Sequence, residues 1–421
     1  MRSDDEFSPW LNWLDGQQQS MLDATIELSR INSGSFNAVG VNAVADACDQ
    51  LSQQLGGIRQ FIEVSPFVSI DSRGESSEQP LGRALSIRKR PDAPLQVFLG
   101  GHLDTVFAAD HPFQEIRWLD QNTLNGPGVA DLKGGLVLMF KALEALERSP
   151  WAERIGWEVL LNPDEEIGSA SSATLLDAAA RRNHLGLIYE PCFADGNLAG
   201  ERKGSGNFTV VARGRAAHAG REHHLGRNAI RALCDFIGGL DDLNGQRAGV
   251  TVNPGYIQGG GAVNVVPEFA LSRFNIRIEQ PEDEHWCLNQ IEVLIAEINR
   301  RDGLELELHG RFGRQPKRMT AANLRLFELV RDCGQRLSMD LNWLPTGGCC
   351  DGNNLAAAGL PNVDTLGVQG GQIHSADEYC LVNSLSQRAK LSALLLMKLA
   401  ASDDLNWLQQ DQLEASINPT D

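Results

Sequence analysis

The order of strands and helices constrains the fold of this 421-residue chain more than any other feature. Buried strands and helices alternate before residue 206. Expected strands occupy 95–107, 155–161 and 185–190, and expected helices occupy 8–29, 39–55, 132–148 and about 170–181. This alternation predicts an α/β layer architecture with a mostly parallel or mixed sheet, and functional groups at the carboxyl ends of strands.

The pattern changes from about Gly206 and returns after 313. Strand-like segments begin at about 207, 249, 268 and 304, and helical segments occupy 226–240 and 281–299. The resulting β-α-β-β-α-β order predicts an antiparallel sheet backed by two helices. A helix at 321–337 and a Gly-rich segment at 345–376 then resume the first pattern. We therefore expect one domain in two parts, 1–205 and 314–421, interrupted by an α+β insert at 206–313.

Composition excludes several classes of function. The chain has 37 Lys and Arg against 55 Asp and Glu, a net charge of −18, which argues against a nucleic-acid partner. Its eight cysteines form no C-x-x-C pair and resemble thiols of a reducing compartment. No apolar run approaches the roughly 18 residues of a membrane span, and the start lacks a signal-peptide pattern. We expect a cytoplasmic protein without a membrane partner.

Three adjacent acids, Asp164, Glu165 and Glu166, follow the apolar strand ending in LLN. An ordinary explanation is a solvated turn before a helix, where negative charge suits the helix dipole. The rest of the chain decides between this explanation and a functional one.

Other candidate side chains also follow strands or glycine-rich turns. His102 and Asp104 stand two apart in GGHLDTV, where period-two geometry points them the same way. The remaining candidates are Asp131 in GPGVADLKGG, Glu190 in IYEP and His374 in GGQIHSADEY. Each has an ordinary alternative, such as a helix N-cap for Asp131 or a surface histidine for His374. Together they form an N/O ligand set suited to a metal such as zinc, and no HExxH occurs.

Six motifs give the chain a specific resemblance. GGHLDTV, GPGVADLKGG, NPDEEIGS, YEP, GRAAHAG and GGAVNVVP…FNIR stand in the order found in the glutamate carboxypeptidase, acetylornithine deacetylase and succinyl-diaminopimelate desuccinylase family of two-zinc hydrolases. The resemblance spans 95–380, and the glutamate carboxypeptidase branch is the most similar. It implies a mixed-sheet zinc-peptidase domain carrying a lid or dimerisation insert.

The resemblance also implies roles for the candidate residues. Asp131 would bridge two zinc ions, with His102 and Glu190 on one ion and Glu166 and His374 on the other. Glu165 would be the general base, and Asp104 would orient His102 by a hydrogen bond. The Asp131–Leu132 peptide would be cis. Neighbouring Glu165 and Glu166 would then differ in role, because one holds metal while the other moves protons.

Three residues of the insert acquire roles only through the resemblance. Taken alone, His218, Asn264 and Arg277 are a loop histidine, a turn asparagine and a surface arginine. In the family they close over the substrate: His218 polarises the scissile carbonyl, often from a partner subunit, and Arg277 and Asn264 hold a carboxylate, for which a planar guanidinium is well shaped. We therefore expect a homodimer.

One segment departs from the family pattern, because TGGCCDGNN carries Cys349 and Cys350 where relatives have a small or hydroxyl residue. The alternative to a role near the substrate is a pair of small buried residues. The expected activity is hydrolysis of an amide bond in a peptide or N-acyl amino acid with a free carboxylate, using two Zn²⁺, or Co²⁺ or Mn²⁺ in their place. Alternatives are a dipeptidase, a ureido-hydrolase or a non-catalytic metal-binding relative.

Overall fold

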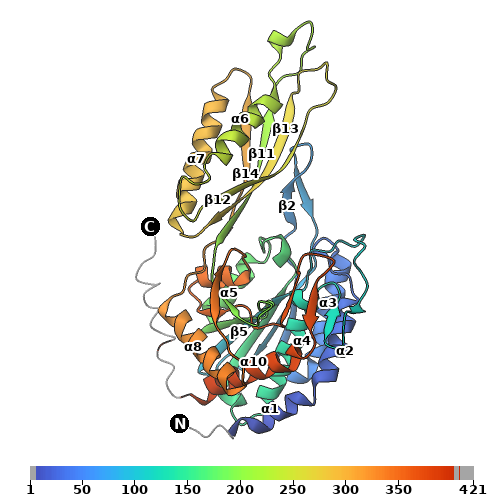
Figure 1. Cartoon of the computed structure of the whole chain (residues 1–421), viewed down its shortest axis with the longest axis vertical. Coiled ribbons are helices and arrows are strands. Elements are labelled where there is room, and N and C mark those ends of the chain that lie inside the picture. Colours follow the sequence, from blue (N-terminus) through green and yellow to red (C-terminus); the bar gives the residue numbers. More distant parts are fainter. Residues whose placement is uncertain (1–5, 403–406, 408–421) are drawn as a thin grey trace.

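The computed structural model describes residues 6–402 and 407. Figure 1 shows a large body below and a four-stranded unit (residues 204–314) above it. The chain enters the upper unit once and leaves it once, so the body is built from segments on both sides of it. The structure is of the mixed α/β class expected from the sequence.

The body is organised around a six-stranded mixed sheet. In spatial order its strands are β1 (Ile58–Ile62), β4 (Ala84–Lys89), β8 (Ile155–Asn162), β5 (Leu95–His102), β9 (Leu185–Ile188) and β16 (Asn362–Val363). The contacts among β8, β5, β9 and β16 are parallel, whereas β1 and β4 pair antiparallel. The carboxyl ends of β5 and β8 therefore meet at one edge, where His102 pairs in register with Asn162.

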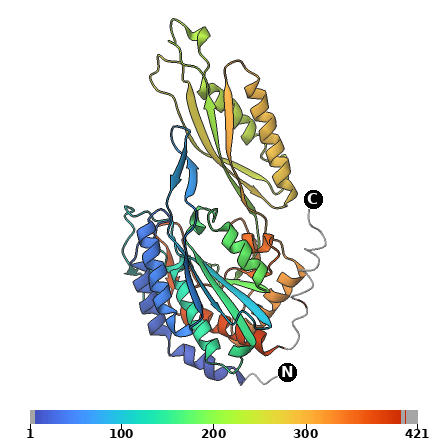
Figure 2. The same cartoon turned by 180° about the vertical axis from the view of Figure 1, so that it is seen from behind.

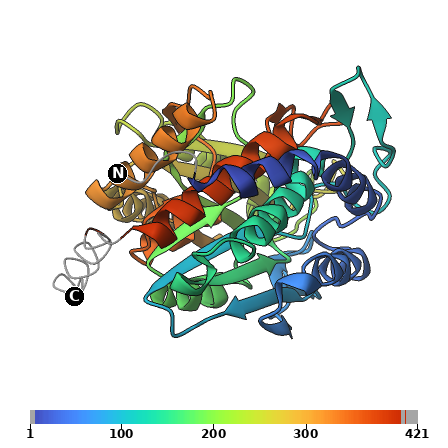
Figure 3. The ribbon, with the colours of Figure 1, turned by 90° about the horizontal axis from the view of Figure 1, so that it is seen from below.

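Helices cover both faces of this sheet, so its central strands β5 and β8 are almost entirely buried. One face packs against α2 (Gln18–Ser29), α3 (Ala38–Leu51), α4 (Gly134–Glu147), α8 (Ala321–Arg336) and α10 (Ser384–Ala401). Seen from below in Figure 3, α10 and α4 lie side by side, with α1 (Ser8–Asp15) against them. The other face packs against α5 (Ala173–Arg182) and α9 (Asp351–Ala357).

The four-stranded unit has the expected β-α-β-β-α-β order. It comprises β11 (Gly204–Arg213), α6 (Ala229–Asp241), β12 (Thr251–Gly259), β13 (Phe269–Ile278), α7 (Glu282–Asn299) and β14 (Glu305–Arg314). The antiparallel strand order is β12-β13-β11-β14. Even-numbered residues of β13, such as Phe274 and Ile276, pack under α6 and α7. Odd-numbered residues, including Arg277, lie on the opposite, open face.

Several short elements had no counterpart among the expected ones. A hairpin of β2 (Phe67–Ile70) and β3 (Ser76–Gln79) rises from the body to the open face of the upper unit, as Figure 2 shows from behind. A parallel pair joins β10 (Leu198–Arg202) to β15 (Trp343–Thr346). A small sheet contains β17 (Gly370–Gly371), β18 (Tyr379–Leu381), β7 (Thr123–Asn125) and β6 (Arg117–Trp118).

Two of the boundaries that differ from the expected ones do so for clear local reasons. The helix expected at 8–29 is two helices, because the chain turns at Gly16 and Gln17. The helix expected from Leu132 begins at Gly134, after a turn in which Asp131 and Leu132 have non-helical torsions. Within the described residues, none of the helices has the length and apolar character needed to cross a membrane.

Candidate active site

His102 ends strand β5 at the centre of the body sheet and is almost fully buried. Its Nδ1 lies 2.9 Å from the carbonyl oxygen of Asp104 and 3.4 Å from Asp104 Oδ1. A carbonyl oxygen can only accept a hydrogen bond, so Nδ1 donates and Nε2 is left to face the rest of the site. This is the arrangement in which a carboxylate-bearing neighbour orients a metal-binding imidazole.

Asp104 also organises the acidic turn on the neighbouring strand. Its two carboxylate oxygens accept the backbone N–H groups of Glu165 and Glu166 at 3.1 and 3.2 Å, and Ser35 Oγ donates to Oδ2 at 2.7 Å. One buried carboxylate therefore fixes both the histidine at the end of β5 and the turn after β8.

Asp131 lies in a distorted helical turn, Val129–Lys133, and its peptide bond to Leu132 is cis, as the resemblance implied. It does not act as the N-cap of α4, which is Lys133. The Glu378 carboxylate accepts the N–H groups of Gly128, Ala130 and Asp131 at 3.0 to 3.1 Å. Sequence reasoning missed Glu378, although it stands only four residues after His374.

The three acids after β8 have three different environments, and the alternative of a solvated turn does not describe them. Asp164 is fully buried and accepts backbone N–H groups of Ser171 and Ser172 and the Ser172 hydroxyl, next to the start of α5. Burial raises the pKa of Asp164 to about 6. Glu166 turns towards His374, and Glu165 turns towards Arg314.

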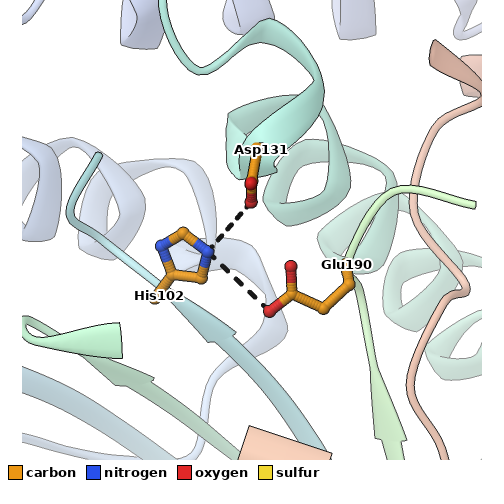
Figure 4. Close-up of side chains that lie close together, drawn as sticks. All are labelled: His102, Asp131 and Glu190. Carbon is orange, nitrogen blue, oxygen red and sulfur yellow. Dashed lines mark hydrogen bonds and ion pairs between the residues drawn. The ribbon is translucent and has the colours of Figure 1, made fainter. Parts of the chain in front are cut away.

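Five of the predicted site residues form two groups that share Asp131. In the first, drawn in Figure 4, His102 Nε2 lies 3.2 Å from Asp131 Oδ1 and 3.8 Å from Glu190 Oε1. In the second, His374 Nε2 lies 3.3 Å from Asp131 Oδ2 and 3.2 Å from Glu166 Oε2. The two oxygens of one carboxylate thus face two different histidines.

The charges in these groups fit cations held between the side chains. Burial, together with the charge of Asp131, raises the pKa values of Glu166 and Glu190 to about 8. Hydrogen bonds with Asp131 and Glu166 raise the pKa of His374 to about 11. Among the described residues, buried Glu190 Oε1 has no hydrogen-bond partner. Crowded carboxylates, two imidazoles and an unsatisfied oxygen are the donor set expected for a metal such as zinc.

Arg314 is a further residue of the site that sequence reasoning missed. It lies at the end of β14, is buried, and places Nη2 2.6 Å from Glu165 Oε1. The same nitrogen donates to the carbonyl oxygen of Glu165 at 3.0 Å and to Ser169 Oγ at 3.1 Å. Asp351 Oδ1 accepts a hydrogen bond from the Ser169 hydroxyl at 2.5 Å. Burial raises the pKa of Asp351 to about 6.

A pocket of about 900 Å³ lies between the body and the upper unit. Its lining includes Glu165, Glu166, His374, Arg277 and Cys349. The Arg277 guanidinium donates from Nε to Asn275 Oδ1 at 2.9 Å and from Nη1 to Cys349 Sγ at 2.8 Å. The guanidinium of Arg277, from the upper unit, therefore reaches the pocket that contains the acidic turn.

The two cysteines that depart from the family pattern have different surroundings. Cys349 is partly exposed and lines the pocket. Cys350 is buried, and its sulfur accepts the N–H of Gly352 at the start of α9. Only the first of the pair is therefore placed to meet a bound molecule.

His218 and Asn264 are not brought to the ligand groups of their own chain. They lie in adjoining loops, where the N–H of Ala219 donates to the carbonyl oxygen of Asn264 at 2.9 Å. Figure 1 shows segment 214–228 at the end of the upper unit farthest from the body. The lining of the 900 Å³ pocket, as described, includes neither residue.

Comparison with known proteins agrees with this geometry. The chain is 24% identical over 395 residues to carboxypeptidase G2 of Pseudomonas sp. (strain RS-16), covering 91% of this chain and 90% of that protein. It is 27% identical over 236 residues to a probable succinyl-diaminopimelate desuccinylase of Staphylococcus epidermidis, covering 48% of this chain and 58% of that protein. The fold matches that of the di-peptidase Dug1p from Saccharomyces cerevisiae with a TM-score of 0.73 and 14% identity, covering 96% and 100% of the two chains.

Residues 98–398 match the sequence model of peptidase family M20/M25/M40, which is well over half of the chain. This match includes both ligand groups, the acidic turn and the whole four-stranded unit. The chain therefore belongs to peptidase family M20/M25/M40, and it is a metal-dependent hydrolase that acts on carbon–nitrogen bonds.

Proposed function

We propose that this protein is a two-zinc hydrolase that removes the C-terminal amino acid from a peptide or an N-acyl amino acid. The observation that carries the proposal is the position of Asp131, whose two carboxylate oxygens face His102 and His374 separately. Such a carboxylate suits two ions side by side, each completed by one further glutamate, Glu190 or Glu166. Co²⁺ or Mn²⁺ would fit the same donors.

Bound zinc would supply an activated water and polarise the scissile carbonyl. The protein would supply the proton transfers. Glu165 adjoins ligand Glu166 but belongs to neither ligand group, and it lines the pocket. We assign it the role of general base, which takes a proton from the attacking water and returns it to the leaving nitrogen.

Arg277 is our candidate for the group that binds the substrate carboxylate. Three arginines of the upper unit line the pocket beside Glu165 and Glu166, namely Arg277 from β13 and Arg311 and Arg314 from β14. Arg314 is already engaged by Glu165 and Asp351, whereas among the described residues the hydrogen-bond partners of the Arg277 guanidinium are neutral side chains, Asn275 and Cys349. A planar guanidinium with neutral partners is free to bind a carboxylate by two parallel hydrogen bonds.

His218 and Asn264 would complete the site of a second copy of the chain. They lie together and away from their own ligand groups, which supports a homodimer assembled through a domain comprising residues 206–313, with 1–205 and 314–421 forming the metal-binding domain. All eight cysteines are free, which supports a cytoplasmic location.

The test is a substrate panel assayed on the purified protein before and after chelation and zinc reconstitution. It contains N-acyl amino acids, short peptides, N-carbamoyl amino acids and unblocked dipeptides, each also made as its C-terminal amide. We expect zinc-dependent release of the C-terminal amino acid from free acids and little release from the amides. Turnover restricted to unblocked dipeptides, or to N-carbamoyl compounds, would instead identify a dipeptidase or a ureido-hydrolase.

A further inference from the structure

Three asparagines form a row across the open face of the four-stranded unit. Asn275 on β13 pairs in register with Asn207 on β11 and with Asn253 on β12. Asn275 Nδ2 donates to Asn207 Oδ1 at 2.7 Å. Asn207 and Asn253 are exposed, so their remaining amide donors and acceptors face solvent. Arg277 stands two residues along the same strand, about 7 Å away at the usual rise of a strand.

The β2–β3 hairpin is docked on this face beyond the asparagine row. We call residues 67–79 the hairpin arm. Three carbonyl oxygens near its turn accept hydrogen bonds from the sheet: Ile70 from Arg273 at 2.9 Å, Ser72 from Gln258 at 3.4 Å and Gly74 from Arg213 at 3.3 Å. Figures 1 and 2 show the arm spanning the space between body and upper unit.

Apolar contacts accompany these hydrogen bonds. Val211 and Leu271 are fully buried although both lie on the face that carries no helices. Gly74 stands close to the Val211 side chain and the Phe269 ring, where even an added Cβ would approach within 3.0 Å. The hairpin arm therefore packs closely against this part of the sheet and buries it.

The docked arm and the sheet enclose a groove of about 1060 Å³. Its lining contains all three asparagines, together with the rings of Phe36, Phe67 and Tyr256. Phe36 and Tyr256 are 50% and 46% exposed, which leaves aromatic surface available to a bound molecule.

The groove adjoins the 900 Å³ pocket that contains the acidic turn. Phe67, Val68, Asn207 and Gly310 line both, whereas Arg277 and Cys349 line only the pocket. The shared residues thus mark the side on which the pocket opens into the groove. The groove is therefore open to a substrate that extends beyond the pocket.

The geometry points to a subsite for a peptide segment in this groove, on the acyl side of the bond that is cleaved. The exposed amides of Asn207 and Asn253 offer donors and acceptors that complement the N–H and C=O of a peptide group, whereas the amide of Asn275 is already hydrogen bonded to Asn207 and Arg277. The aromatic rings and the exposed Val68 offer apolar surface to its side chains. The preferred substrates are then peptides of three or more residues, in contrast to N-acetyl amino acids. This inference rests on the proposed function.

The experiment compares N-acetyl-X with acetyl-Gly-Gly-X, where X is one amino acid that the protein releases. We expect kcat/KM of the wild-type protein to be at least about tenfold higher for the peptide. Asn253→Leu keeps the side-chain size and removes the amide, and Asn207→Leu does the same at the junction of groove and pocket. Each is expected to reduce the ratio of kcat/KM between the peptide and N-acetyl-X by about fivefold, the value of a typical hydrogen bond.

Asn289→Leu is the matched control, because Asn289 is exposed on helix α7 and its side chain, within the described part of the chain, hydrogen bonds only with His285. Its ratio of kcat/KM between the peptide and N-acetyl-X is expected to equal that of the wild-type protein. Light scattering on each variant checks whether the open face is instead covered by a second copy. If Asn253→Leu or Asn207→Leu changes the oligomeric state and leaves the ratio of kcat/KM unchanged, the subsite is wrong. Equal losses of kcat/KM on the peptide and on N-acetyl-X would also overturn it.

The two proposals fail in different ways. If wild-type protein cleaves N-acetyl-X and the peptide equally well, the subsite is wrong and the hydrolase assignment stands. If it cleaves neither with zinc present, the proposed function itself is wrong.

Discussion

Arg314 places a guanidinium nitrogen 2.6 Å from the carboxylate of Glu165, and both side chains are buried. The adjoining carboxylate of Glu166 instead lies 3.2 Å from His374. Two neighbouring acids in one short turn are therefore paired with two different side chains. This separation gives a structural reason for assigning them different roles.

Glu165→Ala is expected to retain metal and to lose about 10²–10⁴-fold in kcat, the usual contribution of a general base. Glu166→Ala is expected to lose one of two bound ions, because it removes a ligand from the group that contains His374. Elemental analysis of each dialysed variant and steady-state kinetics measure these effects. Loss of metal from Glu165→Ala with retention in Glu166→Ala would show that the two roles are reversed.

Much of the candidate ligand set could be predicted from the sequence because its residues follow elements with strong local signals. His102, Asp131 and Glu190 stand next to apolar strands or a glycine-rich helix start, and the motif order linked them to one another. Arg314 could not be predicted in this way, because it is 149 residues from Glu165 and meets it only when β14 returns to the body.

The hairpin arm could not be predicted from the sequence, for a related reason. Its sequence, FVSIDSRGESSEQ, is largely polar and has no clear alternation. Its position depends on carbonyl oxygens that meet Arg213, Gln258 and Arg273, residues of a different part of the chain. A local sequence pattern does not contain that information. The strands of the four-stranded unit could be predicted because apolar and polar residues alternate along them.

Arg277→Lys tests the carboxylate site. Lysine keeps the charge but cannot form two parallel hydrogen bonds, so kcat/KM for substrates with a free α-carboxylate should fall by about tenfold or more. The slow cleavage of the matched C-terminal amides should change little. Parallel assays on acid and amide substrates measure both. A similar loss on acids and amides would mean that Arg277 does not bind the carboxylate.

Metal binding should weaken as the pH falls. In the metal-free chain, burial and the charge of Asp131 raise the pKa values of Glu166 and Glu190 to about 8, so protons occupy these ligands at lower pH and must leave when zinc binds. Each displaced proton makes the affinity about tenfold weaker per unit of pH below that range.

Competition with a chromogenic chelator at pH 6, 7 and 8 measures this dependence. Calorimetry in two buffers of different ionisation enthalpy counts the protons released. Glu190→Ala provides a control, because it removes one titrating ligand and should flatten the dependence. An affinity that does not vary between pH 6 and 8 would contradict the prediction.

Asp364→Asn should destabilise the fold strongly. Asp364 is fully buried between Arg202 at 2.8 Å and Lys317 at 2.9 Å. Removing its charge leaves two buried cations without a counter-ion, which costs about 3–5 kcal/mol of unfolding free energy. Asp177→Asn is the control, because it breaks an exposed pair with Arg181 and should cost about 0.5 kcal/mol or less.

Urea unfolding in the presence of a chelator measures both variants without a contribution from bound metal. The pH dependence has a defined sign. Burial opposes ionisation of Asp364, but Arg202 and Lys317 outweigh it and lower the pKa to about 2. Its contribution to stability is therefore complete above about pH 4 and is lost as the pH falls towards 2. Equal destabilisation by Asp364→Asn and Asp177→Asn would show that the buried pair is not important for stability.

The last prediction is that each active site borrows His218 from a second copy of the chain. His218 and Asn264 lie together in loops away from their own ligand groups, and the sheet ends in two edge strands, β12 and β14. An edge strand is a template for pairing with an identical strand, and a two-fold contact of this kind is self-complementary. Glu305 and Glu307 are exposed at alternate positions of β14. Their like charges discourage pairing of two copies at that edge and so favour a monomer.

Mixing two inactive variants decides between these arrangements. His218→Ala and Glu165→Ala are combined under conditions that allow subunits to exchange. A hybrid dimer has one site with both wild-type groups, so about a quarter of native activity returns when half of the dimers are hybrids. Each variant alone is the control and should stay inactive. A dimer in light scattering, with exchange verified by a mass-tagged subunit and no recovered activity, would show that His218 does not act across the interface.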